Sequence, residues 1–230
     1  MKRSLKINFE QKHLLIKDGG NIILVDTGSP VTIHTSNKFE FGGKEYDVTT
    51  NAMGNTIEKL QAMAGIEFTT LMGVDILSEY KVIFDYANEE ITFCSYDEPT
   101  PCGEECHLNV HMGALITPII IQNCPHPMIL DTGATCSYIK SSLTQGLTPK
   151  DTITDFSPLV GGQFTTPIYD IESGLGDKPF VCTYGNLPKQ IEMMIGLLGV
   201  DGVIGYDLLR FFKLMINIRD HKMHLLTESI

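Results

Sequence analysis

Apolar residues along this chain come in short runs that are broken by polar or glycine-containing turns. The run Leu5–Phe9 alternates apolar and polar side chains, which predicts a strand with one buried face. The runs Leu14–Ile16 and Ile22–Val25 are joined by the turn Asp18–Asn21, and this arrangement predicts a hairpin. Strands with connections this short pair antiparallel, so the pattern indicates an all-β class with few short helices.

The second half of the chain repeats the hairpin. Leu115–Ile121 and Met128–Leu130 flank a turn at Gln122–Pro125. In both halves the second strand ends in the triplet Asp-Thr-Gly, at Asp26-Thr27-Gly28 and at Asp131-Thr132-Gly133. A chain of this length contains one such triplet by chance in about one case in twenty, so two in the same apolar setting indicate an internal duplication.

One helix is predicted in each half. Asn55 would cap the helix Thr56–Ala64, Glu58 would complete a capping box, and Gly65 would end it. Its counterpart in the second half is Asn186–Gly196. Shorter helical turns are expected in two further places, Ile76–Ser78 and Leu208–Arg210.

A second signature follows each triplet. The segments Leu71-Met72-Gly73 and Val203-Ile204-Gly205 match and lie 132 positions apart, whereas the two triplets lie 105 apart. The halves therefore differ by 27 residues between these two marks. The duplicated aspartates that follow, Asp75 and Asp207, are interpreted as caps of short helices.

These paired motifs resemble the aspartic proteases of the retropepsin and pepsin clan, and the chain resembles a retropepsin dimer fused into one polypeptide. The resemblance implies two β-barrel-like lobes, residues 1–95 and 106–230, with a linker at 96–105 rich in proline and acidic residues. It implies that the two triplets meet between the lobes. It also implies that the segments 71–73 and 203–205 pack beneath them.

The resemblance further implies a mechanism. Two carboxyls about 3 Å apart cannot both ionise at low cost, so Asp26 and Asp131 would share one proton. The ionised carboxylate would take a proton from water while the protonated one donates to the scissile carbonyl. The reaction needs no cofactor, metal or covalent intermediate. Which aspartate is ionised stays open, because the apparent pKa values belong to the pair.

The residues beside the two aspartates receive supporting roles from the resemblance. The threonines would cross-bond beneath the dyad, and the glycines would permit close approach of the backbone. Ser29 would hydrogen-bond a catalytic carboxylate, as in pepsins, whereas Ala134 is the retropepsin-type residue and cannot. The supporting set is Thr27, Gly28, Ser29, Thr132, Gly133 and Ala134. In the alternative reading, both aspartates merely cap turns.

The 27-residue difference predicts a single flap, on the C-terminal lobe. Phe41–Tyr46 resembles Leu175–Phe180 at an offset of 134, so the extra residues lie between the triplet and this second hairpin. In the family that interval holds a hairpin that folds over the substrate. We expect it to run approximately from Phe156 to Tyr169, and the alternative is an ordinary surface turn. The predicted flap residues are Leu159, Val160, Gly161, Gly162, Gln163 and Phe164.

The composition of the chain narrows the classes of partner that it can bind. The 230 residues are 43% hydrophobic and carry a net charge of −11, which argues against nucleic acid or an anionic membrane surface as a partner. No run approaches the roughly 20 apolar residues that span a bilayer, and no signal peptide is evident, so we expect a cytoplasmic protein. The six cysteines are interpreted as free thiols.

Metal binding and histidine chemistry are not expected. Cys102, Cys106, His107 and His111 lack the spacing of a zinc site. Cys136 is interpreted as a small buried residue behind the active site. The histidines form no duplicated pattern and are expected to be mostly surface or strand residues.

The leading hypothesis is an aspartic endopeptidase that binds an extended polypeptide, with a restricted intracellular processing role. The alternative is a catalytically weak peptide-binding or regulatory module of the same fold. We expect an active monomer, because the duplication supplies both aspartates in one chain. Its terminal strands, Leu5–Phe9 and Met223–Leu226, are expected to join Ile91–Cys94 and His107–Val110 in a sheet that bridges the lobes.

Overall fold

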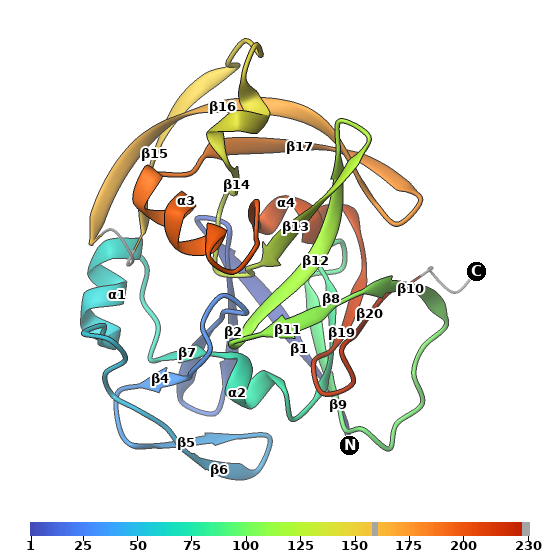
Figure 1. The fold of residues 1–230 in the computed structure, drawn as a ribbon. Coiled ribbons are helices and arrows are strands. Elements are labelled where there is room, and N and C mark those ends of the chain that lie inside the picture. The colour runs from blue at the N-terminus through green and yellow to red at the C-terminus, as the bar shows by residue number, and fades with distance from the viewer. Residues whose placement is uncertain (158–160, 227–230) are drawn as a thin grey trace.

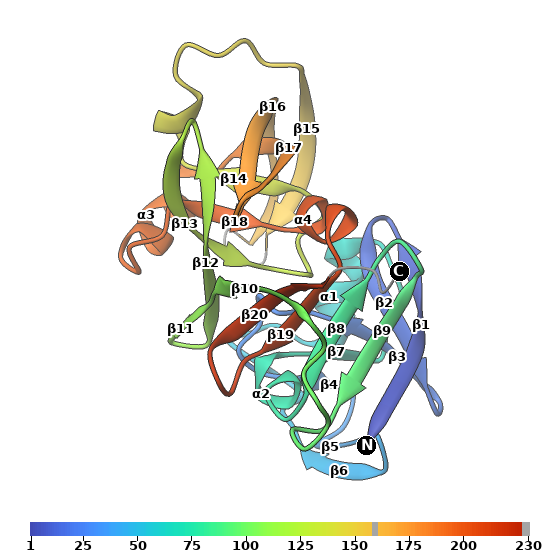
Figure 2. The same cartoon turned by 90° about the vertical axis from the view of Figure 1, so that its right-hand side faces the viewer.

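The computed structural model describes residues 1–157 and 161–226, and most of them form β-strands, as predicted (Figure 1). Two large sheets dominate, one above the other in Figure 2. A small hairpin, β5 (Lys38–Phe41) and β6 (Lys44–Asp47), lies beside the first sheet.

The larger sheet of the described chain has ten strands, in the order β10-β20-β19-β8-β9-β1-β2-β3-β7-β4. It takes most of its strands from the N-terminal half. Their bounds are β1 Lys2–Glu10, β2 His13–Asp18, β3 Asn21–Val25, β4 Ile33–His34, β7 Thr70–Met72, β8 Lys81–Asp85, β9 Glu90–Cys94, β10 Gly103–His107, β19 Leu214–Asn217 and β20 Lys222–Leu226.

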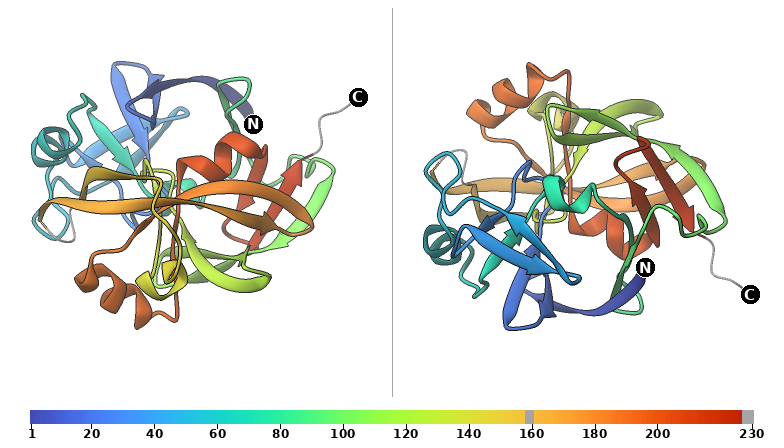
Figure 3. Two further views of the ribbon diagram at one scale, coloured as in Figure 1. Left: turned by 90° about the horizontal axis from the view of Figure 1, so that it is seen from above. Right: turned by 90° about the horizontal axis from the view of Figure 1, so that it is seen from below.

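The second sheet of the described residues has eight strands, in the order β11-β12-β13-β18-β14-β17-β16-β15. The long strands β16 and β17 cross the whole molecule when it is seen from above (Figure 3, left). The bounds are β11 Asn109–His111, β12 Ala114–Ile121, β13 Cys124–Leu130, β14 Ser137–Ile139, β15 Asp151–Ser157, β16 Gly162–Leu175, β17 Lys178–Asn186 and β18 Gly202–Ile204.

The internal duplication is visible in the strand pairing. In the first half β3 runs parallel to β7, and in the second half β13 runs parallel to β18. In addition, β7 pairs antiparallel with β4, and β18 pairs antiparallel with β14. The two matching apolar-apolar-Gly segments therefore occupy equivalent places, each beside the strand that ends in a triplet. These parallel pairs, together with β14–β17, are exceptions to the predicted antiparallel pairing.

The helices differ from the predicted ones at their starts. Helix α1 is Ile57–Ala64, and Thr56, not Asn55, is its N-cap, accepting a hydrogen bond from the Lys59 main chain; Gly65 ends it as predicted. Glu58 is thus one position too early for a capping box. Helix α3 is Lys189–Gly196, because Pro188 is the N-cap and keeps the preceding residue extended. The remaining helices are α2 Val74–Leu77, α4 Tyr206–Phe211 and the short 3₁₀ helix η1 Ser141–Thr144.

The ten-stranded sheet contains strands from both predicted lobes, 1–95 and 106–230. β1 pairs with β9, and β10 pairs with β20, so the terminal strands do enter one sheet. The expected strand His107–Val110 is wrong, because the bridging strand is β10 and the next strand, β11, pairs with β12 in the other sheet. Residues 103–105, which fall in the predicted linker 96–105, belong to β10.

The core of the described residues has one large cluster that takes residues from both sheets, and three smaller clusters, one of them formed by Ile83, Cys94 and Met215. We call the other two small clusters the N-terminal apolar cluster and the C-terminal apolar cluster. The first contains Leu15, Leu24, Ile33, Ile57, Leu60, Ala64, Ile66, Phe68 and Leu71, and the second Ile116, Cys136, Tyr138, Leu187, Ile191, Ile195 and Val200. Each packs one helix, α1 or α3, onto its half of the molecule.

Candidate active site

The two aspartates follow equivalent strands and are held by equivalent bonds. The main-chain N–H of Asp26 donates to the carbonyl of Met72 at 2.9 Å, and that of Asp131 donates to Ile204 at 3.0 Å. Each triplet is therefore fixed at the end of its hairpin by the parallel strand beside it. The segments Leu71-Met72 and Val203-Ile204 thus contribute to the site through the carbonyls of Met72 and Ile204, which accept these bonds.

The two threonines join the triplets through four hydrogen bonds. The main-chain N–H of Thr27 donates to Oγ1 of Thr132 at 3.0 Å, and that of Thr132 donates to Oγ1 of Thr27 at 2.9 Å. Each hydroxyl then donates across to the other half, Thr27 to Leu130 at 2.8 Å and Thr132 to Val25 at 2.7 Å. Both threonines are buried, so this reciprocal network fixes the two loops against each other.

The glycines of the triplets bring each loop against the opposite carboxyl. A Cβ atom on Gly28 would lie 2.4 Å from Cγ of Asp131, and one on Gly133 would lie 2.7 Å from Cγ of Asp26. Within each loop the glycine N–H donates to its own aspartate, at 2.8 Å from Gly28 and 2.9 Å from Gly133. Only glycine leaves room for this arrangement.

The carboxyls of Asp26 and Asp131 are within hydrogen-bonding reach of each other, and they titrate as a pair. Both retain some exposed surface and line the cavity described below. Burial raises the pKa of both carboxyls, and the charge of Asp131 raises that of Asp26 further. At Asp131 the interaction with the carboxyl of Asp26 opposes the rise in pKa, and so do main-chain N–H groups, including that of Ala134 at 3.1 Å. The pair is therefore suited to hold a proton.

Ser29 does not have the contact expected for it. Its hydroxyl donates to the carbonyl of Val31 at 2.8 Å, because the loop after the triplet curls back on itself. Ala134 has no hydroxyl to offer and contributes its main chain instead. The two halves thus support the dyad through main-chain donors.

The glycines behind the site, Gly73 and Gly205, are also required by close packing. A Cβ on Gly73 would lie 2.6 Å from the backbone of Val31, and one on Gly205 would lie 2.3 Å from the carbonyl of Ala134. Their N–H groups donate to equivalent hydroxyls, Thr32 at 3.0 Å and Ser137 at 3.2 Å.

The expectation that Asp75 and Asp207 cap helices is wrong. The N-caps of α2 and α4 are the glycines before them. Asp75 accepts two hydrogen bonds from Thr32, at 2.9 Å from its N–H and 2.6 Å from its hydroxyl. Asp207 forms an ion pair with Arg210 at 3.7 Å. Asp75 therefore fixes the loop behind the first triplet.

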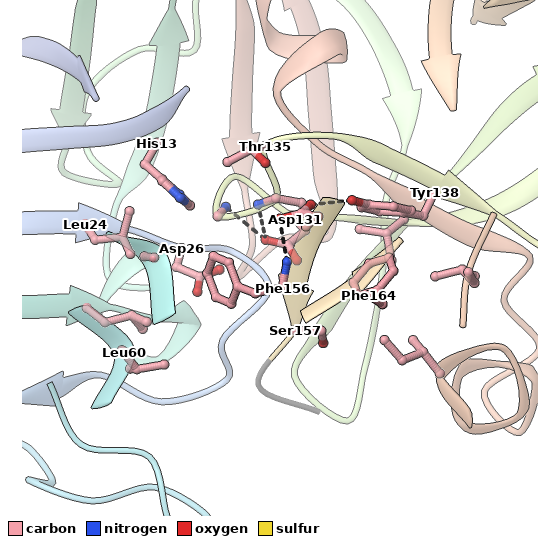
Figure 4. Close-up of a pocket in the computed structure, with 18 of the residues that line it drawn as sticks. His13, Leu24, Asp26, Leu60, Asp131, Thr135, Tyr138, Phe156, Ser157 and Phe164 are labelled. Atoms are coloured by element: carbon pink, nitrogen blue, oxygen red, sulfur yellow. Dashed lines mark hydrogen bonds between the residues drawn. The ribbon is translucent and has the colours of Figure 1, made fainter. Parts of the chain in front are cut away.

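A cavity of about 190 Å³ opens above the two aspartates. Figure 4 shows Asp26 and Asp131 on its floor, with apolar side chains on both sides. The N-terminal apolar cluster forms one wall through Leu24, Leu60, Ala64, Phe68 and Leu71. The C-terminal apolar cluster and its neighbours form the other through Tyr138, Leu187, Ile191 and Val203.

A hairpin of the C-terminal half covers this cavity. Its strands are β15 and β16, and Phe156, Ser157 and Phe164 from them line the cavity (Figure 4). The hairpin is longer than the predicted span Phe156–Tyr169. Gly161 closes it with a φ of 69°, and its N–H donates to Ser157 at 3.1 Å. Gly162 and Gln163 pair with Ser157 and Phe156, whereas Leu159 and Val160 lie outside the described residues.

Tyr138 anchors both strands of the hairpin. Its hydroxyl donates to Asp155 on β15, and its ring lies 5.6 Å from the ring of Phe164 on β16. Asp155 and Phe164 are directly paired. Phe156 instead packs against the N-terminal apolar cluster, so the hairpin contacts both walls of the cavity.

His13 is a site residue that no sequence motif marks. It is 4% exposed and lines the cavity beside Asp26 and Asp131 (Figure 4). Burial lowers the pKa of its imidazole, and the charge of Asp155 and the main chain of Gly133 oppose this shift. The signal was available in the hairpin register: counting back across the pairs Leu15–Leu24 and Ile16–Ile23 places residue 13 opposite residue 26.

The other candidate groups lie apart from this cavity. Cys136 is buried in the C-terminal apolar cluster, as predicted. The six cysteines are free, with Cys102 and Cys124 exposed. Within residues 1–157 and 161–226, no group of three His, Cys, Asp or Glu side chains is arranged to hold a metal ion. In the same ranges, no helix has the length and apolar character needed to cross a membrane.

Comparison of the sequence with models of known protein families found no match, and comparison with curated proteins found none either. The functional assignment therefore depends on the geometry of the site.

Proposed function

We propose that this chain is an aspartic endopeptidase with the two-lobed aspartic protease arrangement, its lobes being residues 1–95 and 106–230. The observation that carries the proposal is the meeting of Asp26 and Asp131, each against the glycine of the opposite triplet, on the floor of a covered cavity. Two aspartates that only capped turns would not require glycine in the opposite loop. The equivalent strand pairs β3–β7 and β13–β18 support the two-lobed arrangement.

The chemistry follows from one shared proton. Water attacks the peptide carbonyl carbon while one carboxylate takes its proton and the other carboxyl gives its proton to the carbonyl oxygen. The resulting tetrahedral diol then collapses, the C–N bond breaks, and the amine nitrogen takes up a proton. The raised pKa of both carboxyls keeps a proton available for the first step.

The substrate class we propose is a polypeptide in extended conformation. β15 is the last strand of its sheet among the described residues, so its outer edge offers main-chain groups to an added strand. The apolar walls on both sides of the dyad favour apolar side chains next to the cleaved bond. We further propose a restricted processing role in the cytoplasm, where the free thiols would stay reduced.

The proposal is tested with a mixture of unstructured peptides. The protein is expected to cut a subset of them, with mass spectrometry identifying both new ends of each cut peptide. Cleavage should survive metal chelation and reagents that modify serine or cysteine nucleophiles, because the proposed step uses only water and two carboxyls. A protein that binds peptides without cutting them would instead support the weak peptide-binding module.

The active form is predicted to be a single chain, because both aspartates come from one polypeptide. Specific activity is expected to stay constant as the protein is diluted, and sedimentation should give the mass of one chain. Activity that fell with dilution alongside dissociation of a dimer would contradict this prediction.

Tyr138→Phe is predicted to weaken closure of the hairpin formed by β15 and β16, which we call the flap hairpin. It removes the hydroxyl bonded to Asp155 while keeping the ring beside Phe164. We expect kcat/KM to fall about tenfold, mainly through a higher KM, because the covering hairpin is held less firmly over the substrate. Peptide kinetics measure the effect.

The matched control for that variant is Tyr184→Phe. Tyr184 is also a buried tyrosine whose hydroxyl is hydrogen-bonded, to Ser173 at 3.0 Å, but it does not line the cavity. Equal losses in the two variants would show that a buried tyrosine hydroxyl matters for stability alone. Substitutions in the N-terminal segment 31–38, apart from its buried residues Thr32, Ile33 and His34, are expected to cost less activity than changes in the flap hairpin.

A further inference from the structure

His13 has a structural counterpart in the second half of the chain, and the counterpart is an alanine. Both residues begin the first strand of their hairpin, directly after a turn with positive φ angles, at Gln11-Lys12 and at Met112-Gly113. The pairs Leu15–Leu24 and Ile116–Ile129, continued by two residues, place His13 opposite Asp26 and Ala114 opposite Asp131. The duplication is therefore broken at one of the positions nearest the dyad.

The imidazole of His13 carries an unpaired polar atom. Nδ1 is buried and has no hydrogen-bond partner among the described residues. Buried polar atoms are almost always paired, so an exception calls for an explanation. The other two such atoms in the described chain, on Tyr86 and His224, belong to residues that do not line the dyad cavity.

The position of the ring proton decides what Nδ1 can do. The main chain of Gly133 favours the protonated ring, whereas Nδ1 has no partner among the described residues, so we assign the N–H of the neutral imidazole to Nε2. A neutral imidazole has one N–H, and once it is used the other nitrogen is an acceptor. The free atom beside the dyad is thus a hydrogen-bond acceptor without a donor.

The flap hairpin lies beside the ring of His13. The ring of Phe156 lies 6.4 Å from the ring of His13, and Asp155 is the charged group of β15 that faces it. His13, Asp155 and Phe156 also line a second cavity. A peptide that displaces Phe156 from the N-terminal wall would meet His13 next.

We propose that His13 is a specificity-determining residue, whose Nδ1 accepts a hydrogen bond from a donor-bearing side chain of the substrate on one side of the cleaved bond. Suitable side chains are those of Ser, Thr, Asn and Gln. On the other side, Ala114 packs against the C-terminal apolar cluster and offers no hydrogen-bond acceptor on its side chain, and the lining there is apolar. The two sides of the dyad thereby select different side chains. This inference rests on the proposed endopeptidase function.

The test uses pairs of peptides derived from one cleaved sequence. At each position flanking the cut, Thr is compared with Val and Asn with Leu, which match in shape and differ in donors. At one position the wild-type protein is expected to favour the donor by about tenfold in kcat/KM, since a site built for a hydrogen bond discriminates against a partner that lacks it. A ratio of two substrates does not depend on how much of the protein is active.

Three variants complete the experiment. His13→Ala copies the residue of the second half and His13→Leu fills the volume without an acceptor, so both should lose the preference. His13→Gln, which keeps a carbonyl acceptor, should retain part of it. His224→Ala removes the other buried histidine with an unpaired Nδ1, outside the cavity, and should keep the wild-type ratio.

The outcomes separate the two proposals. Cleavage that depends on Asp26 and Asp131, with the same ratio in wild type and in whichever of His13→Ala and His13→Leu folds, would overturn the role of His13 alone. A wild-type protein that shows no donor preference at any position would overturn it as well. Absence of cleavage that depends on these aspartates would overturn the endopeptidase function and the role of His13 with it.

Discussion

Asp26→Asn and Asp131→Asn are each expected to lower kcat for peptide hydrolysis by about 10⁴-fold. An amide can neither take the proton of water nor return it to the amine, and the pair loses the proton that it shares. The double variant should be hardly slower than either single variant, because the two carboxyls act as a unit. Kinetics on a cleaved peptide measure all three proteins, and substantial turnover in either single variant would contradict the dyad.

The same substitutions are expected to stabilise the fold near neutral pH. Burial raises the pKa of both carboxyls above the unfolded values, so ionising the pair costs folding free energy at higher pH. That cost disappears as the pH falls and the carboxyls become protonated. Asparagine avoids it, so each variant should have a higher Tm than wild type at about pH 7, with the difference shrinking towards about pH 3.

Gly28→Ala and Gly133→Ala are expected to be the next most damaging changes. The added Cβ would lie 2.4 Å and 2.7 Å from the opposite carboxyl carbon, well inside contact distance. The carboxyl must move, and displacement of a reacting group by about 1 Å costs about 10²-fold in rate. Activity should therefore fall by at least about that factor, measured as kcat/KM on the same peptide.

The control for these alanines is Gly20→Ala. Gly20 lies in the turn before β3, a Cβ there would meet no atom within 4 Å among the described residues, and its φ is not positive. Its activity should match wild type. If Gly28→Ala were as active as Gly20→Ala, the carboxyl of Asp131 would not be held against the first triplet.

The sequence alone could predict the elements whose cause is local. Two apolar runs joined by the turn Asp18–Asn21 predict the hairpin β2–β3, and Gly65 ends α1 because its positive φ suits glycine. Where two neighbouring residues can both cap, as with Asn55 and Thr56, the local signal cannot choose. The start of α3 was misplaced because the residue before Pro188 is kept extended.

The contacts within the site were harder to predict from the sequence, because they depend on both halves of the chain at once. The motif identifies Asp26 and Ser29 equally well, yet the hydroxyl of Ser29 turns to Val31 once the loop closes. His13 belongs to no motif. In the turn before it, Gln11 and Lys12 have positive φ angles, which non-glycine residues seldom adopt, so the sequence does not indicate this turn. Only the register of the hairpin relates it to Asp26.

The pairing of β8 with β19 has a consequence for synthesis on the ribosome. The sheet of the N-terminal half stays open along β8 until residues 214–226 have been translated, so the nascent chain carries a bare strand edge for most of its synthesis. Asp131 is synthesised well before β19 becomes available to pair with β8. A chain truncated after residue 205 would thus contain every residue of the dyad and both triplets and still lack β19 and β20, which complete the sheet that supports the first triplet.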